Sequence, residues 1–548
     1  MEYKIDTYDF DKNLKNEIEN NDSINEWPVV YMIHGKNEMY IGETNDVNMR
    51  MNQHLSTKER YTKLNRVNII SNEKFNKSAI LDLEALLIEY ISADGRYKLQ
   101  NRNGGQSKNH KYYQKDMYLD SFENLWKQLM EKKLVNHTLE EIKNTDLFKY
   151  SPYKTFTNQQ NSIVKSIINK ILNDHNSNHK NFIIEGGAGT GKSVLAVYLV
   201  KQLTDIFKEK NIDVNIALVV PVKSLRKTYK EVFGQIYGLK KSMVVSPTET
   251  FKKDYDILIV DEAHRLKRRF GLTNYKSFDN NNKKIKDENG TELDWILNNS
   301  KYSIFFYDRG QSVLPSDVRS SQFRKIMTKD NIYKLDTQMR VIAGDEYINF
   351  INELFKDNNL YRLNQYSIKD YDLKLFTNLD NMINSIKKLD DEYGLCRIVA
   401  GYSWDWKTKE LTYKEAIEKD IYDIVIGNTK LIWNKKDEDW INSENSINEV
   451  GCIHTVQGYD LNYVGVIFGK EIDYIDGHFV IYKDNYKDKK GKLKATEISL
   501  KDYEASLKEY IIKIYKVLLS RGIKGCYIYC VNPGLREYFS KAFDIASH

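Results

Sequence analysis

A glycine-rich run in the middle of the chain has the residue types and spacing of a loop that binds phosphate groups. Glycines let successive backbone N–H groups converge on phosphate oxygens, a lysine adds positive charge, and a serine hydroxyl can hold Mg²⁺. An apolar run precedes it and a helical pattern follows, which is the context that such a loop requires. The run predicts an ATP and Mg²⁺ site with cofactor-binding residues Gly186, Gly189, Thr190, Gly191, Lys192 and Ser193, of which Ser193 contacts the metal.

An acidic pair, Asp261 and Glu262, directly follows the apolar run 257–260. That run predicts a buried strand, so the two carboxylates emerge at its carboxyl end, where the magnesium ion is expected. Asp261 would bind the metal and Glu262 would polarise the attacking water. A solvated turn is the alternative, but the order Asp-Glu-Ala-His after a phosphate loop favours hydrolysis of a nucleoside triphosphate.

A second group of reactive side chains lies nearer the amino terminus. Tyr31 and Tyr40 fall in two apolar runs separated by turn residues, a pattern typical of a β-hairpin. Arg50 and His54 lie one helical turn apart, and Glu84 lies in a later helical pattern. Taken one at a time, these residues have non-catalytic explanations: the tyrosines could be cross-strand neighbours, and Glu84 could be a carboxylate on a helix surface. Phosphodiester hydrolysis needs a base, a cation and a metal, and side chains of these types could supply them.

The order of these residues resembles that of the GIY-YIG nuclease family. Val29-Val30-Tyr31 keeps only the tyrosine of the first motif, whereas Tyr40-Ile41-Gly42 reproduces the second in full, and Asn101 lies ahead of a glycine pair. The resemblance implies an active endonuclease in which Glu84 ligates a divalent metal, Mg²⁺ or Mn²⁺, and Arg50 stabilises charge on the scissile phosphate. It also implies that Tyr31 and Tyr40 order the water and accept its proton, while His54 assists as a base or a phosphate contact.

From residue 155 onward, a set of short motifs resembles the superfamily 1 helicases, and within them the Schlafen-type helicase domain of bacterial proteins. The motifs appear in family order in the segments 157–160, 219–225, 305–312, 338–340, 454–460 and 519–522. The resemblance implies that Gln160 reads adenine, that Asp308 and Gln311 sense the γ-phosphate, and that Arg340 and Arg521 are arginine fingers. It also implies that segment 219–225 contacts a nucleic-acid strand and that segment 454–460 couples nucleotide to nucleic acid.

Alternation of apolar strands with amphipathic helices predicts an α/β fold with parallel sheets. We expect a small α+β GIY-YIG domain followed by two RecA-like parallel-sheet domains of a superfamily 1 helicase. The expected divisions are an amino-terminal extension, the nuclease domain, a helical connector, an ATP-binding RecA-like domain and a second RecA-like domain with insertions, at 1–27, 28–107, 108–154, 155–345 and 346–548. The polar stretches 272–293 and 482–495 are expected to be surface insertions.

Bulk composition narrows the class of protein. The chain of 548 residues has a formal net charge of +6, which suits a nucleic-acid partner without establishing one. Its four cysteines are too few and too irregularly spaced for a disulfide framework. No signal peptide or run of roughly 18 apolar residues is present, so we expect a cytoplasmic location without a membrane partner.

These features predict an ATP-dependent nucleic-acid motor coupled to a metal-dependent endonuclease that acts on DNA. The resemblance to bacterial nuclease-helicase fusions suggests antiphage defence; DNA repair or processing is the alternative within the same chemistry. An ATP-driven remodelling switch whose GIY-YIG fold only binds nucleic acid, and a translocase on RNA, also remain open. The sequence does not define protein partners and leaves oligomer formation open.

Overall fold

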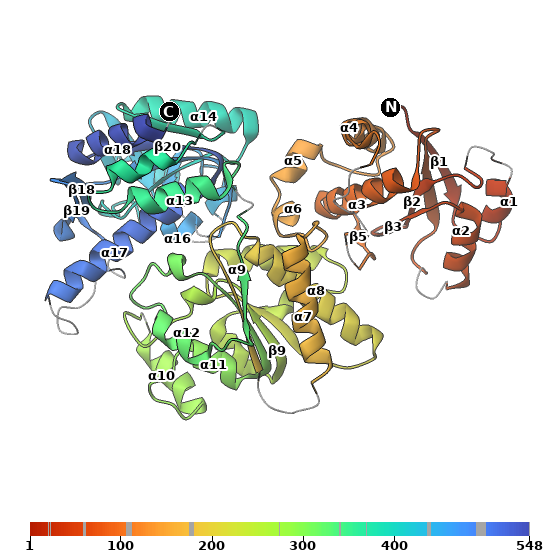
Figure 1. Ribbon diagram of the computed structural model, residues 1–548, viewed down its shortest axis with the longest axis horizontal. Coiled ribbons are helices and arrows are strands. Elements are labelled where there is room, and N and C mark those ends of the chain that lie inside the picture. The colour runs from red at the N-terminus through yellow and green to blue at the C-terminus, as the bar shows by residue number, and fades with distance from the viewer. Residues whose placement is uncertain are drawn as a thin grey trace. The chain divides into compact units, whose positions relative to one another are not determined.

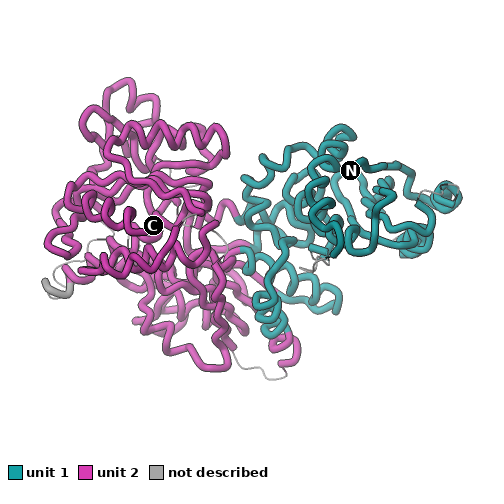
Figure 2. The backbone as a smooth tube through the Cα atoms, turned by 45° about the horizontal axis from the view of Figure 1, so that its top comes forward, with its two compact units in different colours: residues 1–168, 194–214, 229–243 teal, residues 169–193, 215–228, 244–548 magenta. Residues whose placement is uncertain are grey.

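The structure is a computed structural model that describes residues 1–19, 21, 24–57, 62–102, 104–105, 112–174, 180–272, 274–338, 341–368, 370–435, 440–456, 458–488, 491 and 500–546. The chain forms two compact units (Figure 2). Unit 1 comprises residues 1–168, 194–214 and 229–243, and unit 2 comprises residues 169–193, 215–228 and 244–548.

Unit 1 contains a five-stranded sheet in the order β1-β4-β2-β3-β5 (Figure 1). Its strands are β1 (Lys4–Asp9), β2 (Val29–His34), β3 (Glu38–Thr44), β4 (Arg66–Ser71) and β5 (Lys98–Leu99). The expected hairpin is β2–β3, in which Tyr31 lies opposite Gly42. One face of the sheet packs with α1 (Leu14–Glu19) and α2 (Val47–Ser56), and the other packs with α3 (Lys77–Asp94).

Segments on both sides of residues 28–107 join this domain. β1, which lies in the expected extension 1–27, pairs antiparallel with β4. The expected connector contains α4 (Lys115–Glu131), α5 (Leu139–Lys143) and α6 (Asp146–Tyr150). Trp126 of α4 is buried in the same hydrophobic core as Leu87 of α3. The amphipathic connector helix therefore buries its apolar face on the nuclease domain rather than only linking two domains.

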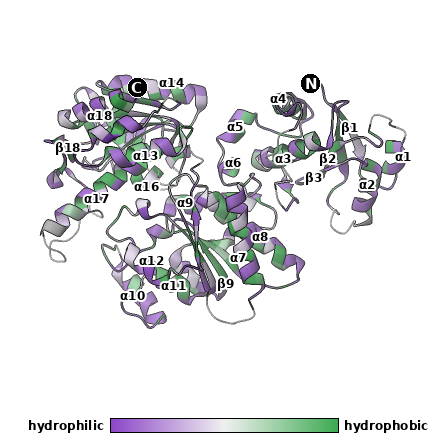
Figure 3. Cartoon of the chain, in the orientation of Figure 1, coloured by the Kyte–Doolittle hydropathy of each residue, from purple (hydrophilic) through white to green (hydrophobic). Residues whose placement is uncertain are grey.

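Unit 2 contains a six-stranded parallel sheet in the order β11-β6-β10-β9-β7-β8. Its strands are β6 (Lys180–Gly186), β7 (Ile216–Val219), β8 (Val244–Val245), β9 (Tyr255–Val260), β10 (Ser300–Tyr307) and β11 (Ile332–Leu335). Both faces of such a sheet are covered, so its strands read as continuous apolar runs, which Figure 3 shows in green near the label of β9. α11 (Glu292–Asn298) and α12 (Ser320–Ile326) pack on one face.

A seven-stranded sheet in unit 2 has the order β12-β20-β17-β13-β16-β15-β14. Its strands are β12 (Asp372–Phe376), β13 (Arg397–Ala400), β14 (Ile424–Ile426), β15 (Thr429–Trp433), β16 (Glu449–Gly451), β17 (Leu461–Phe468) and β20 (Gly522–Cys530). All neighbours are parallel except the edge pair β14–β15. α14 (Leu379–Tyr393) packs on one face, and α17 (Leu500–Leu519) and α18 (Pro533–Ala546) contact Phe468 on the other.

The remaining elements complete the two units. They are α7 (Asn158–Leu172), α8 (Lys192–Glu209), α9 (Lys223–Gln235), α10 (Tyr275–Lys284), α13 (Gly344–Leu354), α15 (Tyr413–Glu418), α16 (Ile453–Val456), the hairpin β18 (Ile472–Ile475) and β19 (His478–Ile481), and short 3₁₀ turns including η4 (Ala263–Arg265) and η5 (Arg309–Gln311).

Both expected surface insertions contribute buried side chains. Asn282, at 1% exposure, accepts a hydrogen bond from the indole of Trp295. Tyr486 is also buried, while residues 489–490 and 492–495 lie outside the described residues. Side-chain packing therefore anchors both polar stretches. Other residues of the first stretch are buried as well: Phe278, Asn281, Thr291, Glu292 and Leu293.

The four cysteines are buried free thiols. Within the described ranges, no helix is long and apolar enough to span a membrane.

Candidate functional site

In unit 1, the β2–β3 hairpin brings the two tyrosines of the predicted nuclease site together. The rings of Tyr31 and Tyr40 lie 6.3 Å apart between centroids. Tyr31 is fully buried, and a Cβ atom on Gly42 would lie 2.3 Å from its hydroxyl oxygen. The glycine of the Tyr-Ile-Gly motif therefore leaves the space that the Tyr31 hydroxyl occupies.

Helix α2 presents Arg50 and His54 to that same hydroxyl. Asp46 caps the helix by accepting from the backbone N–H of Met49 at 2.8 Å. Nε of Arg50 donates to the Tyr31 hydroxyl at 3.0 Å, and Nε2 of His54 lies 2.8 Å from it. Since Arg50 can only donate, this geometry lets Tyr31 direct its own proton to Nε2 of a neutral His54.

The electrostatic surroundings of Tyr31 keep its hydroxyl protonated at rest. Burial raises the pKa of Tyr31 well above its usual range and the nearby Tyr40 raises it further, whereas Arg50 lowers it. A phenol in this state can pass on a proton only as it receives one. The arrangement is therefore suited to a relay between a water molecule and His54 rather than to a standing phenolate.

Glu84, the predicted metal ligand, is partly buried on α3. Burial and the negative charge of Glu43 raise its pKa to about 7, against smaller opposing effects of Lys77 and Arg50. Glu43 is itself ion-paired with Lys77. A carboxylate oxygen is a donor that Mg²⁺ and Mn²⁺ prefer, and a divalent cation would relieve the unfavourable charge. Among the described residues, no cluster of three His, Cys, Asp or Glu could cage a metal. Glu84 thus fits a site completed by water and phosphate oxygens.

Asn101 contributes to the site in a way that sequence spacing did not reveal. Its side chain accepts from the backbone N–H of Ile41 at 3.1 Å and donates to the carbonyl of Ile41 at 2.8 Å. Ile41 lies between Tyr40 and Gly42, so this pair of hydrogen bonds fixes the strand that carries both. The position of Asn101 before two glycines was the only sequence signal.

The predicted phosphate loop of unit 2 joins β6 to α8, as expected. Gly189 and Gly191 have φ values of 79° and 78°, which favour glycine. Nζ of Lys192 donates to the carbonyls of Gly186 and Gly187 at 2.9 and 2.5 Å. Thr190 is buried and its hydroxyl donates to the carbonyl of Gly187 at 3.1 Å.

Next to this loop lies an open surface depression of about 590 Å³. Its lining includes the backbone of Gly186 and Gly187 and the charged side chains of Glu185, Asp308, Arg309, Lys334 and Asp336. The hydroxyl of Ser193 and the carboxylate of Asp261 are oxygen donors of the kind that hold Mg²⁺, so the residues present fit a Mg²⁺-bound nucleotide.

The acidic pair follows β9, at the carboxyl end of a buried strand. Asp261 is fully buried, and Glu262 adopts a left-handed φ of 52°. Nε2 of His264 lies 2.8 Å from Oε2 of Glu262. Burial opposes ionisation of Glu262, but its interactions with His264 and with the positive charges of Lys192 and Arg521 hold its pKa below the usual range. Glu262 is therefore kept as a carboxylate, the form that can polarise a water molecule.

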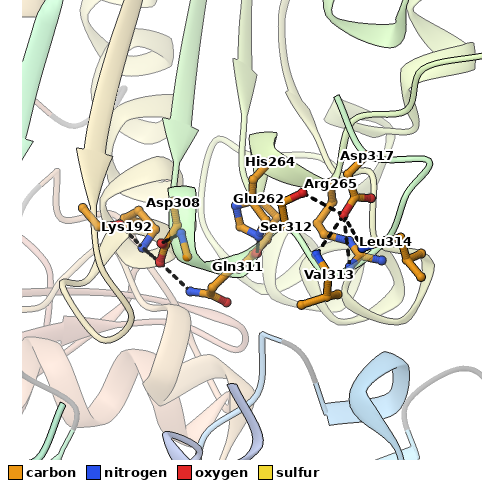
Figure 4. A network of polar contacts seen from close by, with 12 residues as sticks. Lys192, Glu262, His264, Arg265, Asp308, Gln311, Ser312, Val313, Leu314 and Asp317 are labelled. Carbon is orange, nitrogen blue, oxygen red and sulfur yellow. Dashed lines mark hydrogen bonds and ion pairs between the residues drawn. The ribbon is translucent and has the colours of Figure 1, made fainter. Parts of the chain in front are cut away.

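A chain of polar contacts runs from Lys192 of the phosphate loop through Asp308 to Gln311 (Figure 4), and Gln311 in turn contacts Arg521. Oδ2 of Asp308 accepts from Lys192 at 3.2 Å and from the Gln311 amide at 2.7 Å. Nη2 of Arg521 donates to Oε1 of Gln311 at 3.3 Å, although Arg521 follows helix α17 of the seven-stranded sheet. Arg521 is only 1% exposed. The structure thus brings together Lys192, Glu262, Asp308, Gln311 and Arg521.

The segments expected to contact nucleic acid and to couple it to nucleotide also meet. The hydroxyls of Thr228 and Tyr459 lie 2.9 Å apart. A Cβ atom on Gly458 would lie 2.3 Å from Leu225. Nη1 of Arg521 donates to the carbonyl of Tyr459 at 3.3 Å. The motif around Tyr459 therefore contacts both the arginine and the first turns of α9.

Other predicted residues have different outcomes. Gln160 is buried in unit 1, where it caps α7 by exchanging hydrogen bonds with Thr157, and its adenine-reading role stays a prediction. Arg340 and Gln457 lie outside the described residues. Three partly buried aromatic side chains pack against the core of the seven-stranded sheet; they are Tyr402, Trp404 and Trp406.

Comparison with known proteins bears on both halves of the chain. Residues 179–532 match the family described as Schlafen group 3, DNA/RNA helicase domain, and residues 28–98 match the GIY-YIG catalytic domain. The uncharacterized protein YPL245W of Saccharomyces cerevisiae is 28% identical over 417 residues, which cover 68% of this chain and 87% of that protein. The two family matches confirm both resemblances inferred from the motifs.

Two solved structures are also similar to parts of the chain. Domain III of the replication initiation protein DnaA from Thermotoga maritima has a TM-score of 0.21 and 14% identity, covering 49% of this chain and 94% of that one. A DEAD box protein from Methanococcus jannaschii has a TM-score of 0.24 and 12% identity, covering 75% of this chain and 94% of that one. Likeness at this level adds nothing to the assignment.

Proposed function

Since the chain belongs to the Schlafen group 3 DNA/RNA helicase family and carries a GIY-YIG catalytic domain, we propose that it is an ATP-driven motor coupled to an endonuclease. The motor engages or moves along a nucleic-acid strand, and the attached nuclease hydrolyses phosphodiester bonds of DNA in the presence of Mg²⁺ or Mn²⁺. ATP binding gates the cleavage, so that the nuclease stays inactive until the motor has found its substrate.

The observation that carries the nuclease half is the arrangement around Tyr31. Its hydroxyl contacts Arg50 at 3.0 Å and His54 at 2.8 Å. In the proposed reaction, Tyr31 takes a proton from the attacking water as His54 accepts the proton of Tyr31, and Arg50 stabilises the negative charge that develops on the oxygens of the scissile phosphate. Glu84 would hold the divalent cation, which stabilises the leaving oxygen.

The motor half is supported by the polar chain from Lys192 to Arg521. Lys192 would bind the β- and γ-phosphates, Ser193 and Asp261 would hold Mg²⁺, and Glu262 would orient water for attack. Gln311 and Arg521 contact each other beside Asp308, where they can respond to the γ-phosphate. Arg340 is proposed as a second arginine finger on its motif alone.

Cleavage of plasmid, linear, nicked and single-stranded DNA with Mg²⁺ or Mn²⁺, with and without ATP, tests the proposal. We expect Glu84→Ala to abolish cutting while ATP hydrolysis continues, and Lys192→Ala to abolish hydrolysis and ATP-dependent cutting. A wild-type protein that never cuts, or equal cutting by the Glu84 variant, would contradict the nuclease role. Unchanged cutting by the Lys192 variant would contradict gating alone.

We further propose that the protein acts in the cytoplasm as an antiphage defence nuclease. The support is the resemblance to bacterial nuclease-helicase fusions and the logic of a nuclease that needs a motor to license it. Plaque formation on cells that express the wild-type chain, Glu84→Ala or Lys192→Ala is the direct test. Protection by wild type alone is expected, whereas equal plaque counts in all three strains argue against defence.

A further inference from the structure

We propose that Arg102 is a positioning residue through which helix α8, which begins at the phosphate-loop residue Lys192, controls the nuclease site. The inference rests on the two activities proposed above. It adds a physical route by which the state of the ATP site reaches the residues that cleave DNA.

The described residues on either side of Arg102, Asn101 and Gly105, contact both halves of the nuclease site. Asn101 holds Ile41, between Tyr40 and Gly42, through two hydrogen bonds. Gly105 lies against α3, where an added Cβ atom would be 3.1 Å from Cα of Ala85. Ala85 follows the proposed metal ligand Glu84. A shift of these residues would therefore move the tyrosine strand relative to the metal ligand.

Helix α8 makes two contacts with Arg102 within unit 1. The side chain of Gln202 donates to the backbone carbonyl of Arg102 at 3.1 Å, and Glu209 forms an ion pair with the Arg102 guanidinium. Gln202 and Glu209 are seven positions apart, so they lie on one face of the helix. Two contacts on one face fix both the main chain and the side chain of Arg102.

Helix α8 is built to transmit a displacement along its length. It is a single helix from Lys192 to Glu209. Its inward-facing side chains have no exposed surface; they are Leu195, Ala196, Val197, Leu199, Val200 and Leu203. Close-packed side chains of this kind shift together rather than deform. A rearrangement of Lys192 and Ser193 around bound phosphate would thus also displace the carboxyl end of the helix, where Glu209 lies.

Small movements are sufficient for regulation of a nuclease. Misplacing reacting groups by about 1 Å can cost about 100-fold in rate. The Arg102–Glu209 pair itself is weak, because both side chains are about half exposed, at 47% and 48%. Exposed ion pairs of this kind change an equilibrium by about 1.4- to 5-fold. We therefore expect a modest but measurable effect of the pair on ATP gating.

A charge swap tests the proposal in the full-length protein. The ratio of DNA cleavage rates with and without ATP is measured for wild type, Arg102→Glu, Glu209→Arg and the double swap. We expect each single change to reduce this ratio by about two- to five-fold and the double swap to restore it. In high salt, the single variants should differ less from the wild type in this ratio, because salt screens the exposed ion pair.

A matched control uses an exposed ion pair in the same unit. Lys127 and Glu123 on α4 pair at 2.8 Å with exposures of 63% and 66%, so Lys127→Glu should leave the ATP ratio at the wild-type value. Two results overturn the proposal. Single changes at Arg102 and Glu209 could leave the ratio unchanged, or the double swap could fail to restore it.

A second measurement separates this inference from the proposed activities. Hydrogen exchange of peptides that cover β3 is compared with and without a non-hydrolysable ATP analogue. We expect the analogue to change protection of β3 in the wild type but not in Arg102→Glu. If the wild type neither cuts DNA nor hydrolyses ATP, the proposed function fails, and this exchange difference alone still decides the inference. Equal exchange in both proteins overturns it.

Discussion

Arg521 donates a hydrogen bond to the side chain of Gln311 at 3.3 Å, although 210 residues separate them in the chain. Gln311 belongs to a turn that follows the six-stranded sheet, and Arg521 directly precedes β20 of the seven-stranded sheet. The same guanidinium also donates to the carbonyl oxygens of Val517 and Tyr459. The buried guanidinium thus donates to neutral oxygens and also interacts with the nearby carboxylate of Glu262. A phosphate anion would add a charge-assisted hydrogen bond to this guanidinium.

Replacing Arg521 by alanine should abolish ATP hydrolysis while sparing much of the ATP binding. An arginine that stabilises charge on the transferred phosphoryl group contributes about 10³- to 10⁵-fold to the rate. Steady-state hydrolysis and binding of a fluorescent ATP analogue measure the two effects. Arg362→Ala, which removes an exposed arginine of the same unit, is the control. Loss of hydrolysis by less than tenfold would exclude Arg521 as an arginine finger.

Much of unit 2 could be predicted because its signals are local. The apolar runs at 182–184, 257–260, 304–307 and 526–530 all became central strands, and the acidic pair follows β9 as expected. Parallel strands buried on both faces are marked by continuous apolar sequence. Catalytic motifs placed at the ends of such strands could therefore be located without knowledge of long-range contacts.

Features that depend on distant contacts could not be predicted. Strand β1 contains Lys4, Asp6 and Asp9, and it forms only because β4, some sixty residues later, offers an edge. The contact between the hydroxyls of Thr228 and Tyr459 likewise joins residues that are 231 positions apart, so it depends on the arrangement of the two sheets. Neither pattern carries a periodicity or turn signal of its own, so sequence alone could not identify it.

Removing only the hydroxyl of Tyr31 should abolish DNA cleavage. In Tyr31→Phe, Arg50 and His54 lose the oxygen that both contact, and loss of a positioned proton-transfer group costs about 10²- to 10⁴-fold in rate. Single-turnover cleavage measures the effect, with ATP hydrolysis as an internal reference. Tyr3→Phe is the matched control, because it removes a buried hydroxyl that bonds to Ser121 in the same unit. Equal losses in the two variants would indicate a structural effect.

Glu84 should make the nuclease domain less stable as pH rises. Its pKa is about 7 in the folded protein against an ordinary value of 4.5, so the folded state holds a proton that the unfolded state has released between these values. Stability attributable to this group therefore falls from pH 4.5 to 7 and stays low above pH 7. The full penalty is at most about 3 kcal/mol, reduced by partial exposure to solvent.

Glu84→Gln removes this penalty because the amide does not ionise. The melting temperature of the variant should exceed that of the wild type at pH 8, and the two should converge near pH 4.5. Added Mg²⁺ or Mn²⁺ should stabilise the wild type more than the variant, since the cation binds the carboxylate. Scanning calorimetry at both pH values checks these outcomes, and an equal response to metal in both proteins would argue against Glu84 as a ligand.

The hydrogen bond between Tyr459 and Thr228 should couple ATP to nucleic acid. The carbonyl of Tyr459 accepts from Arg521, and its hydroxyl lies 2.9 Å from that of Thr228 and donates to the carbonyl of Ser224 at 3.4 Å. Tyr459 therefore contacts both Arg521 and the segment 219–225. A double-mutant cycle of Tyr459→Phe and Thr228→Val isolates this bond. Each single change should lower the stimulation of ATP hydrolysis by single-stranded DNA by about two- to tenfold, as expected for a buried hydrogen bond.

The double variant should lose no more stimulation than Tyr459→Phe alone, because Tyr459→Phe already removes the bond to Thr228 together with the bond to the Ser224 carbonyl. Tyr538→Phe is the control, since it removes a buried hydroxyl bonded to the carbonyl of Leu354, away from this chain of contacts. Coupling between sites is reciprocal, so single-stranded DNA should also strengthen binding of an ATP analogue less in the variants than in the wild type. Additive losses in the cycle would mean that the two hydroxyls act separately, and the coupling would then have to pass through other contacts, such as that of Gly458 with Leu225.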